Sequence, residues 1–254
     1  MNPVLDLIYK HKSIRKYKNQ PIEDEKLHAI IKAAQSAQNW CNGQHVSIIA
    51  IKDQARKKKM EELCNNQKFI SQCSVFLIFC ADFYRTKFCF EKNGKSEEFN
   101  EYMTHIDNTI IGSHEVGIAI QNATIAAESL GLGVVAIGAV RINSLELTKE
   151  LNLPKYVIPV IGLCVGYADD DPKLKPRLPM SAVFFEDKYD CEKAKSGVND
   201  YDEVYKKYLA ERDSNNLDST WRKKTVDYYI QTKHLIDEDY DLLKKQGFIS
   251  IDKK

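Results

Sequence analysis

The sequence predicts a mixed α/β chain built around a single sheet. Short apolar runs rich in β-branched and aromatic residues occur four times, and stretches with apolar residues at helical spacing alternate with them. No segment repeats at a fixed period, and 254 residues suffice for one large domain or two small ones. We therefore expect one sheet flanked by helices, without tandem organisation.

The expected elements follow one another along the chain with clear boundaries. Pro21 precedes the first long helix, and Gly131 ends the longest one. The run 75–81 is apolar throughout, which is typical of a central strand covered on both faces. In order, we expect a helix at 21–37, a loop at 38–43, a strand at 46–51, a helix at 54–65, a strand at 75–81, a polar excursion at 92–101, a helix at 110–130, and a strand at 134–138.

The last part of the chain differs in composition from the rest. A short helix at 144–151, capped by Ser144, leads to a strand at 157–165. Pro159 lies inside this strand and predicts that it is irregular or at an edge of the sheet. Residues 187–254 are charged and rich in tyrosine, and we expect two or three helices there that pack on something else, a partner subunit or their own domain.

Composition excludes several classes of protein. The net charge of +1 argues against a general nucleic-acid binder, and acidic residues surround most lysine pairs. No apolar run approaches the roughly 18 residues of a membrane span, and the N-terminus lacks the pattern of a secretory signal. The seven cysteines form no C-x-x-C and no zinc-like spacing, so we expect no metal and a reduced, cytoplasmic setting.

Two basic clusters are the main chemical signal. Three basic side chains, an imidazole and a hydroxyl crowd into residues 11–17, and a second basic pair stands at Lys175 and Arg177. Together they suit one phosphate group, with Arg15 as a bidentate donor. The glycines of 131–133 follow a helix and open a strand, which is the reverse of a dinucleotide-binding fingerprint. Gly138 is the last residue of the strand at 134–138. It would allow a planar ligand to approach the backbone closely, although it also fits a strand that simply ends in a turn.

Taken in order, these segments resemble the FMN-dependent nitroreductase superfamily, and most closely its oxygen-insensitive NADPH nitroreductases and NADPH-flavin oxidoreductases. The likeness covers nearly the whole chain, and each motif is weak by itself. The segments that carry it are HKSIRKY at 11–17, NQKFI at 66–70, FCADFYR at 79–85, QNA at 121–123, AAESLGLG at 126–133, AIGAVR at 136–141, GLCVG at 162–166, LKPRLP at 174–179, and SNN at 214–216 with Trp221.

The resemblance implies a fold and a cofactor site. The implied fold is α+β, a mixed and largely antiparallel sheet flanked by helices, with residues 1–254 as a single FMN-binding domain in an intertwined homodimer. The extension 187–254 would wrap the partner subunit. The positions that match the family's cofactor contacts are His11, Lys12, Ser13, Arg15, Gln67, Ile137, Gly138, Ala139, Lys175 and Arg177. Lys12 stands where relatives often have arginine, and Ala139 where they often have a second glycine.

Two further positions concern the substrate and the electron donor. Relatives often carry a serine-rich run beside the flavin where this chain has the loop 38–43. Trp40 in this loop would stack on the substrate, narrow the pocket or simply anchor the loop. Arg212 matches an arginine that grips the 2′-phosphate of NADPH. Leu217 and Asp218 stand where relatives have further arginines, so we expect NADPH to be used with weak discrimination and NADH to be competent.

The implied activity is ping-pong transfer of two electrons from NAD(P)H through FMN to nitroaromatics, quinones or free flavins. The cofactor carries this chemistry, so no side chain is named as catalytic. Two alternatives stay open: a flavin reductase that supplies reduced FMN to a partner protein, and a non-enzymatic flavin-binding or sensing protein. The expected partners are a second copy of the chain and small-molecule acceptors, with no nucleic acid and no membrane.

Overall fold

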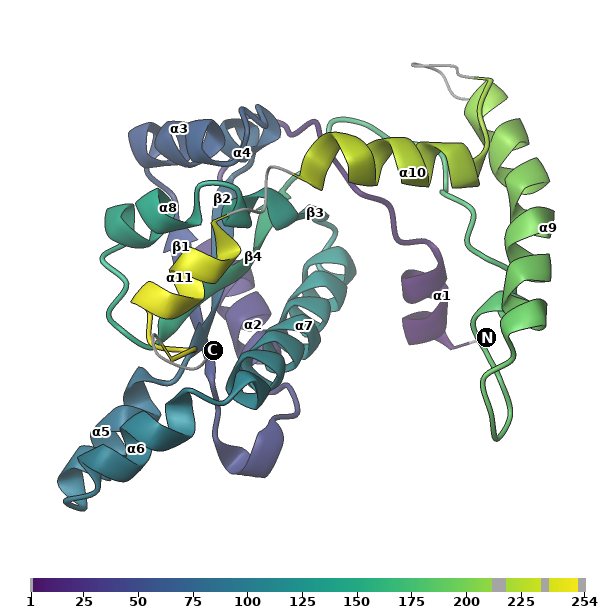
Figure 1. The fold of residues 1–254 in the computed structure, drawn as a ribbon. Helices are drawn as coiled ribbons and strands as arrows, with labels where there is room; N and C mark the ends of the chain where they lie inside the picture. The colour runs from purple at the N-terminus through teal and green to yellow at the C-terminus, as the bar shows by residue number, and fades with distance from the viewer. Residues whose placement is uncertain (1, 212–217, 234–237, 251–254) are drawn as a thin grey trace. The chain divides into compact units, whose positions relative to one another are not determined.

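The computed structural model describes residues 2–211, 218–233 and 238–250. It divides into two compact units, the first comprising Met1–Pro172 and Ile236–Lys254 and the second Lys173–Leu235 (Figure 1). The first unit contains the sheet, and the described part of the second unit is helical. No helix in the described ranges is long and apolar enough to cross a membrane.

The sheet has four strands, all paired antiparallel in the order β1-β2-β4-β3. Their bounds confirm the four strands expected from the sequence. They are β1 (Val46–Ile51), β2 (Val75–Asp82), β3 (Gly133–Ile137) and β4 (Val157–Gly166). All eight residues of β2 are buried, as expected for a central strand.

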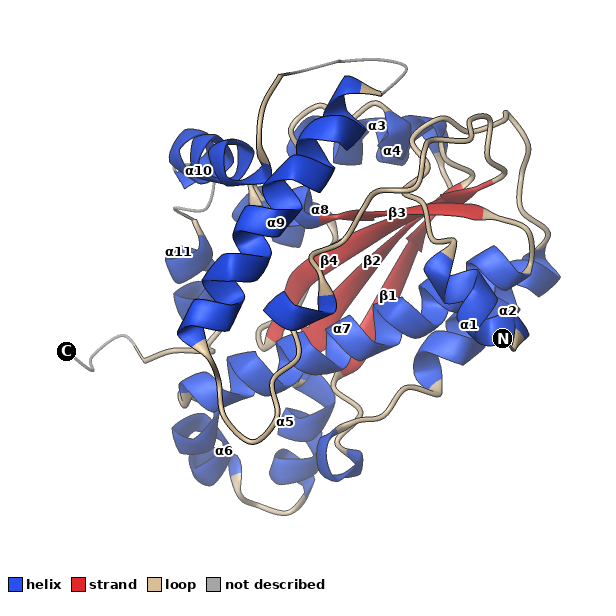
Figure 2. Ribbon diagram, turned by 90° about the vertical axis from the view of Figure 1, so that its right-hand side faces the viewer, coloured by secondary structure: helices blue, strands red, loops and turns tan. Residues whose placement is uncertain are grey.

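Helices cover both faces of the sheet (Figure 2). On one face α2 (Asp24–Gln35) packs beside α7 (Ile106–Ser129); α3 (Gln54–Leu63), α4 (Phe69–Gln72) and α8 (Ser144–Glu150) lie on the other. Side chains of β2 alternate between two apolar cores, with Leu77 and Phe79 in one and Phe76 and Ile78 in the other. The predicted coverage of both faces is confirmed.

Pro159 lies in the part of β4 that pairs with β2 alone, because β3 pairs only with residues 162–166 of β4. The predicted irregularity is present: Phe79 pairs with Ile161 and Cys80 with Pro159, so Val160 is an extra residue at a bulge. Arg141 donates from Nη1 to the Val160 carbonyl at 2.9 Å. The prediction that this part of the strand is irregular or at an edge is therefore confirmed, since the register of the described strands pairs Pro159 with β2 alone.

Some helix predictions need correction. Asn143, and not Ser144, precedes α8; Ser144 is its first residue, and its buried hydroxyl has no hydrogen-bond partner among the described atoms. The polar excursion expected at 92–101 begins where one helix ends, α5 (Tyr84–Lys92), and covers most of a second, α6 (Ser96–Met103). Phe99 and Met103 of α6 reach the core. The N-terminal helix α1 (Pro3–Tyr9) was not expected either.

The described parts of the C-terminal region contain three α-helices, in agreement with the two or three expected. In the second unit α9 (Cys191–Ala210) and α10 (Trp221–Thr232) pack through Tyr201 and Trp221, whose rings lie 5.8 Å apart. The last helix, α11 (Asp239–Lys245), belongs to the first unit. There Tyr156 donates from its backbone N–H to the Gln246 carbonyl at 2.9 Å. Residues 239–248 thus pack on the core of the same chain through Leu242 and Phe248.

Candidate functional site

The N-terminal basic segment lies against β3. Ser13 forms a parallel bridge with Val134, and Ile14 donates from its backbone N–H to the Val134 carbonyl at 2.9 Å. Ile14 is buried, whereas Arg15 is exposed and Ser13 is partly so. Because side chains alternate along an extended segment, Ser13 and Arg15 point away from the core while Ile14 anchors them.

This close approach depends on a glycine in β3. A Cβ on Gly133 would lie 2.7 Å from Cγ1 of Ile14, which is closer than real contacts allow. The segment can therefore pack on β3 only where residue 133 has no side chain. Gly133 was not identified as a site residue from the sequence.

His11 and Lys12 each have an acidic partner. His11 Nδ1 lies 2.6 Å from Oε1 of Glu128 on α7, an interaction that orients the ring and leaves Nε2 for another contact. Lys12 donates from Nζ to Oδ1 of Asp171 at 2.6 Å. The charge of Lys12 is thus shared with a carboxylate, whereas among the described residues Arg15 makes a single long hydrogen bond, from Nη1 to the Ser13 carbonyl at 3.3 Å.

The far end of β3 carries the predicted glycine-containing segment. Ile137 ends the strand, and Gly138 begins a short 3₁₀ turn that includes Ala139 and ends at Arg141. A Cβ on Gly138 would meet only the Arg141 guanidinium, at 3.6 Å. Residues 13–14 and 137–139 therefore flank the same strand, separated by roughly 13 Å of its length.

Gln67 lies in the connection between α3 and α4. Asn65 and Asn66 just before it adopt left-handed backbone conformations, with φ of 60° and 55°. These turn the chain sharply, since asparagine tolerates this region better than most residues. In the described ranges no hydrogen bond engages the Gln67 amide or the Ser13 hydroxyl, so both groups remain available for a ligand.

Trp40 sits on a loop fastened to α7. The carboxylate of Glu115 accepts hydrogen bonds from the backbone N–H groups of Trp40, at 2.8 Å, and His45, at 2.9 Å. Its Oε1 also lies 3.1 Å from His45 Nδ1, and the His45 ring stacks on Phe83. Glu115 is fully buried, whereas Trp40 is 46% exposed. Hydrogen bonds to α7 therefore hold the backbone of the loop, while the Trp40 indole stays accessible.

The other predicted site residues belong to the second unit. Lys175 and Arg177 are exposed, and Tyr201 of α9 holds their segment by donating to the Pro176 carbonyl at 2.7 Å. Arg212 lies outside the described residues. The Asp218 carboxylate pairs with Lys206 at 3.2 Å, and the Arg222 guanidinium is occupied by Asp202 and Asn199.

Sequence reasoning missed the acidic partners of this site. Glu115 and Glu128 both lie on α7, and neither was identified as a site residue, although Glu128 belongs to the AAESLGLG segment at 126–133. One signal was present for Glu115: it lies four residues from Ile111 and from Ala119, on the apolar face of the helix. A carboxylate on such a face needs buried donors. The described residues contain no group of His, Cys, Asp and Glu side chains that could hold a metal ion.

The chain matches known proteins over nearly its whole length. Residues 8–167 match the Nitroreductase family, and residues 175–250 match the Nitroreductase family, C-terminal domain. The FMN reductase [NAD(P)H] of Bacillus subtilis is 40% identical, over 98% of both chains. The oxygen-insensitive NADPH nitroreductase of Salmonella typhimurium is 38% identical, over 87% of this chain and 88% of its own.

A solved structure confirms the fold. The hypothetical oxidoreductase YcnD from Bacillus subtilis superposes with a TM-score of 0.93 at 40% identity, covering 98% of this chain and 99% of its own. Such likeness in sequence and in structure extends across both units of the chain. The protein therefore belongs to the nitroreductase family.

Proposed function

We propose that the protein is an FMN-dependent NAD(P)H oxidoreductase that reduces nitroaromatics, quinones or free flavins by a ping-pong mechanism. The observation that carries this proposal is the arrangement along β3, where the segment with Ser13 and Arg15 lies beside Val134 and an exposed glycine, Gly138, follows the strand. Relatives named FMN reductase and NADPH nitroreductase support it. FMN, when bound, supplies the chemistry: it accepts a hydride from a nicotinamide and passes two electrons to an acceptor.

The donors of the site fit the phosphate and ribityl parts of FMN. Arg15 presents an exposed guanidinium with most of its N–H groups unused, and Ser13 adds a hydroxyl from the same anchored segment. We propose that His11, held by Glu128, and Lys12 contribute to this end, together with Lys175 and Arg177. Arginine and lysine side chains neutralise a phosphate while forming charge-assisted hydrogen bonds.

The remaining site residues suit the flavin ring. The Gln67 amide offers both donors and an acceptor to a ring edge, and Ile137, Gly138 and Ala139 offer backbone groups to the ring. Cationic groups near the ring would favour the anionic reduced form. Trp40 would border the acceptor side, where a flat ring selects flat electron-poor molecules. No side chain is needed as an obligate acid or base.

We propose that the active protein is an intertwined homodimer. Several large apolar side chains of the helices are exposed in the single chain, and α10 alone carries four: Val226, Tyr228, Tyr229 and Ile230. Exposed apolar surface of this kind is typical of an interface. Light scattering of the flavin-loaded protein at micromolar concentration should give twice the chain mass, and a monomer mass would contradict the homodimer.

Either nicotinamide should serve as electron donor. Arg212 would contact the 2′-phosphate of NADPH, but Asp218 and its pairing with Lys206 leave little additional positive charge there. Arg222 is also occupied, by Asp202. The NAD(P)H in the name of the Bacillus subtilis relative agrees with such dual use. All seven cysteines are free thiols, which suits a reducing, cytoplasmic compartment.

A second candidate function is the supply of reduced FMN to another protein. It is favoured by the name of the Bacillus subtilis relative, FMN reductase [NAD(P)H], in which FMN is the compound reduced. The ratio of kcat/KM for free FMN to kcat/KM for a nitroaromatic separates the two roles. A ratio above one would assign flavin reduction as the main activity.

The cofactor itself is tested by releasing it. Heat-denatured protein should yield FMN by chromatography, and FAD or no flavin after reconstitution would contradict the proposal. Arg15→Ala and Arg177→Ala should each weaken FMN binding by roughly 1.5–3 kcal/mol, because each removes a charge-assisted contact. Arg56→Ala is the matched control, since Arg56 lies on α3 and donates to the Glu150 carbonyl.

A further inference from the structure

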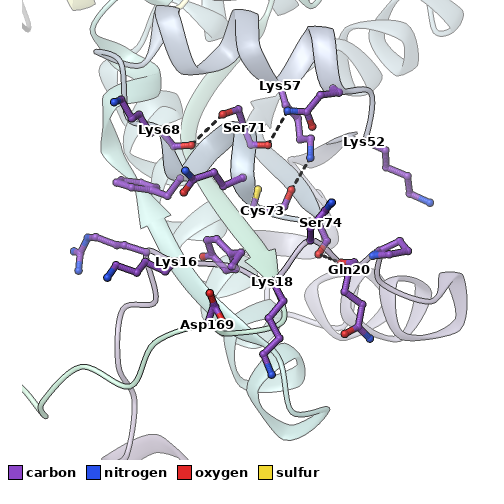
Figure 3. Close-up of a pocket in the computed structure, with 17 residues that line it drawn as sticks. Lys16, Lys18, Gln20, Lys52, Lys57, Lys68, Ser71, Cys73, Ser74 and Asp169 are labelled. Atoms are coloured by element: carbon purple, nitrogen blue, oxygen red, sulfur yellow. Dashed lines mark hydrogen bonds between the residues drawn. The ribbon is translucent and has the colours of Figure 1, made fainter.

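A groove separate from the open backbone at Gly138 runs along the first unit. It encloses about 1040 Å³ between the extended segment 15–21 and the region of α3 and α4. Figure 3 shows its lining, with Lys68 and Ser71 on one side and Lys16, Lys18 and Asp169 on the other. Buried Tyr17 and Cys73 also contribute to the lining. The groove therefore combines buried side chains with charged ones.

The charge in this groove is strongly one-sided. A single carboxylate, that of Asp169, belongs to the lining, although the whole chain has a net charge of only +1. Lys52 is neutralised by Asp24 at 2.6 Å. The other cationic residues of the lining have no ion-pair partner within 4.0 Å among the described residues; they are Arg15, Lys16, Lys18, Lys57 and Lys68.

Lys57 is the least expected of these cations. It is only 6% exposed, and its ammonium donates to the Cys73 carbonyl at 2.6 Å. The two lysines that follow it on α3 are more exposed, yet both have carboxylate partners: Lys58 pairs with Glu61 and Lys59 with Glu146. A buried charge is costly unless an opposite charge accompanies it. Among the cations of the groove, Lys57 would therefore be stabilised most by a bound anion.

The neighbouring polar groups do not supply that partner. The Ser71 hydroxyl donates a hydrogen bond to the Glu61 carboxylate. The Ser74 hydroxyl donates to the Gln20 carbonyl at 2.6 Å, and the Gln54 amide donates to the Ser71 carbonyl at 3.1 Å. These bonds hold α4 and the segment 15–21 in place around the groove. The groove is therefore built by existing contacts and does not have to form when a ligand arrives.

We propose that this groove binds a small phosphorylated anion carrying at least two negative charges, with Lys57 at its floor and Lys16, Lys18 and Lys68 at its rim. Compact ammonium groups suit the several oxygens of a phosphate or pyrophosphate group. The concave shape and limited volume favour a small molecule over an extended polyanion. The Phe69 side chain, also in the lining, offers a wall for an attached ring.

Binding in the groove is coupled to the cofactor through Arg15. Arg15 belongs to the lining and, under the proposed function, also contacts the FMN phosphate. An anion that draws this guanidinium toward the groove weakens its hold on FMN, and bound FMN weakens the anion by the same factor. This coupling rests on the proposed function, whereas anion binding by Lys57 does not.

The test uses the flavin-loaded protein and inorganic pyrophosphate. Calorimetry at constant ionic strength should show one saturable site per chain. Lys57→Met keeps the length of the side chain and should raise the Kd at least tenfold, as should the surface pair Lys18→Ala with Lys68→Ala. Lys59→Ala is the matched control on the same helix and should leave the Kd unchanged. Pyrophosphate should also speed flavin release in the wild type more than in Lys57→Met.

Three results would overturn the proposal. The first is the absence of saturable binding in the wild type. The second is an unchanged Kd in the Lys18/Lys68 variant, which remains informative where Lys57→Met fails to fold. The third is loss of binding in Arg177→Ala together with retention in the Lys18/Lys68 variant, since that would assign pyrophosphate to the flavin phosphate site. A protein without flavin would refute the proposed function, yet its calorimetry would still decide whether the groove binds anions.

Discussion

The carboxylate of Glu115 accepts a hydrogen bond from the backbone N–H of Trp40 at 2.8 Å, across 75 positions of sequence. The same carboxylate accepts from His45, so both ends of the loop are fastened to one buried side chain of α7. Within the loop Cys41 and Asn42 adopt φ values of 47° and 58°, which L-residues rarely do. The hydrogen bonds to Glu115 offset the energetic cost of this unfavourable backbone conformation.

Glu115→Gln should release the Trp40 loop. The amide can replace one acceptor oxygen but places its NH₂ against a backbone N–H, so the free energy of unfolding should fall by roughly 2–3 kcal/mol. In a Trp221→Phe background Trp40 is the sole tryptophan, and its fluorescence should change with the variant. Glu61→Gln, another buried carboxylate, is the control. An unchanged Trp40 spectrum in Glu115→Gln would refute the positioning role.

Gly133→Ala should loosen the basic segment. The new methyl group would lie 2.7 Å from Cγ1 of Ile14, and overpacking of this kind costs about 1–3 kcal/mol. Ser13 and Arg15 would shift with Ile14, so the Kd for FMN should rise. Gly117→Ala is the control, since nothing lies within 4 Å of its Cβ on α7, and it should stabilise the helix by about 0.5–1 kcal/mol. Equal FMN affinity in both variants would contradict the argument.

The cysteines should divide into two classes of reactivity. Burial raises the pKa of the Cys64 thiol to about 12, and burial together with Asp82 does the same for Cys80. Cys41, Cys89 and Cys191 are exposed. Because the thiolate is the reactive form, iodoacetamide at pH 8 should modify only these three in the native protein and all seven after unfolding. Mass spectrometry that finds Cys64 or Cys80 modified in native protein would argue against this core.

The contact between α9 and α10 should weaken in acid. Burial alone would raise the pKa of the Asp202 carboxyl, but hydrogen bonds from the Arg222 backbone and side chain outweigh it and hold the pKa below 3.8. A carboxyl with a lowered folded pKa contributes stability above its unfolded pKa and loses it as the pH falls through the folded value. Asp202→Asn should therefore lower the free energy of unfolding by roughly 1–2 kcal/mol at pH 7.

The difference between Asp202→Asn and the wild type should shrink below pH 4. Trp221 reports on this contact, because its ring lies 5.8 Å from Tyr201, and a Trp40→Phe background isolates its fluorescence. Asp200→Asn on the exposed side of α9 is the control and should follow the wild type. A gap between variant and wild type that is as large at pH 3 as at pH 7 would show that charge on Asp202 is not its source.

Local patterns predicted the strands well, because each strand is a short apolar run with clear ends. Local patterns did not predict features that depend on residues distant in the sequence. Pro159 is tolerated because it lies beyond the end of β3, where a bulge at Val160 and a hydrogen bond from Arg141 accompany it. Neither is visible in the strand's own sequence.

The same limit applies to the site. The basic residues 11–17 could be read as a phosphate-binding cluster because their chemistry is local. Glu115 and Lys57 could not be identified, since the first acts on a loop some 70 residues away and the second is distinguished only by its burial. Phe99 likewise reaches the core from a helix whose sequence is mostly polar.

The most direct test of the central claim is an anaerobic titration of the purified protein with NADPH and, separately, with NADH. The account predicts that about one equivalent of either donor per chain bleaches the flavin absorbance, and that a nitroaromatic added afterwards restores it. A flavin that stays oxidised with both donors would contradict the account and leave a protein that only binds flavin.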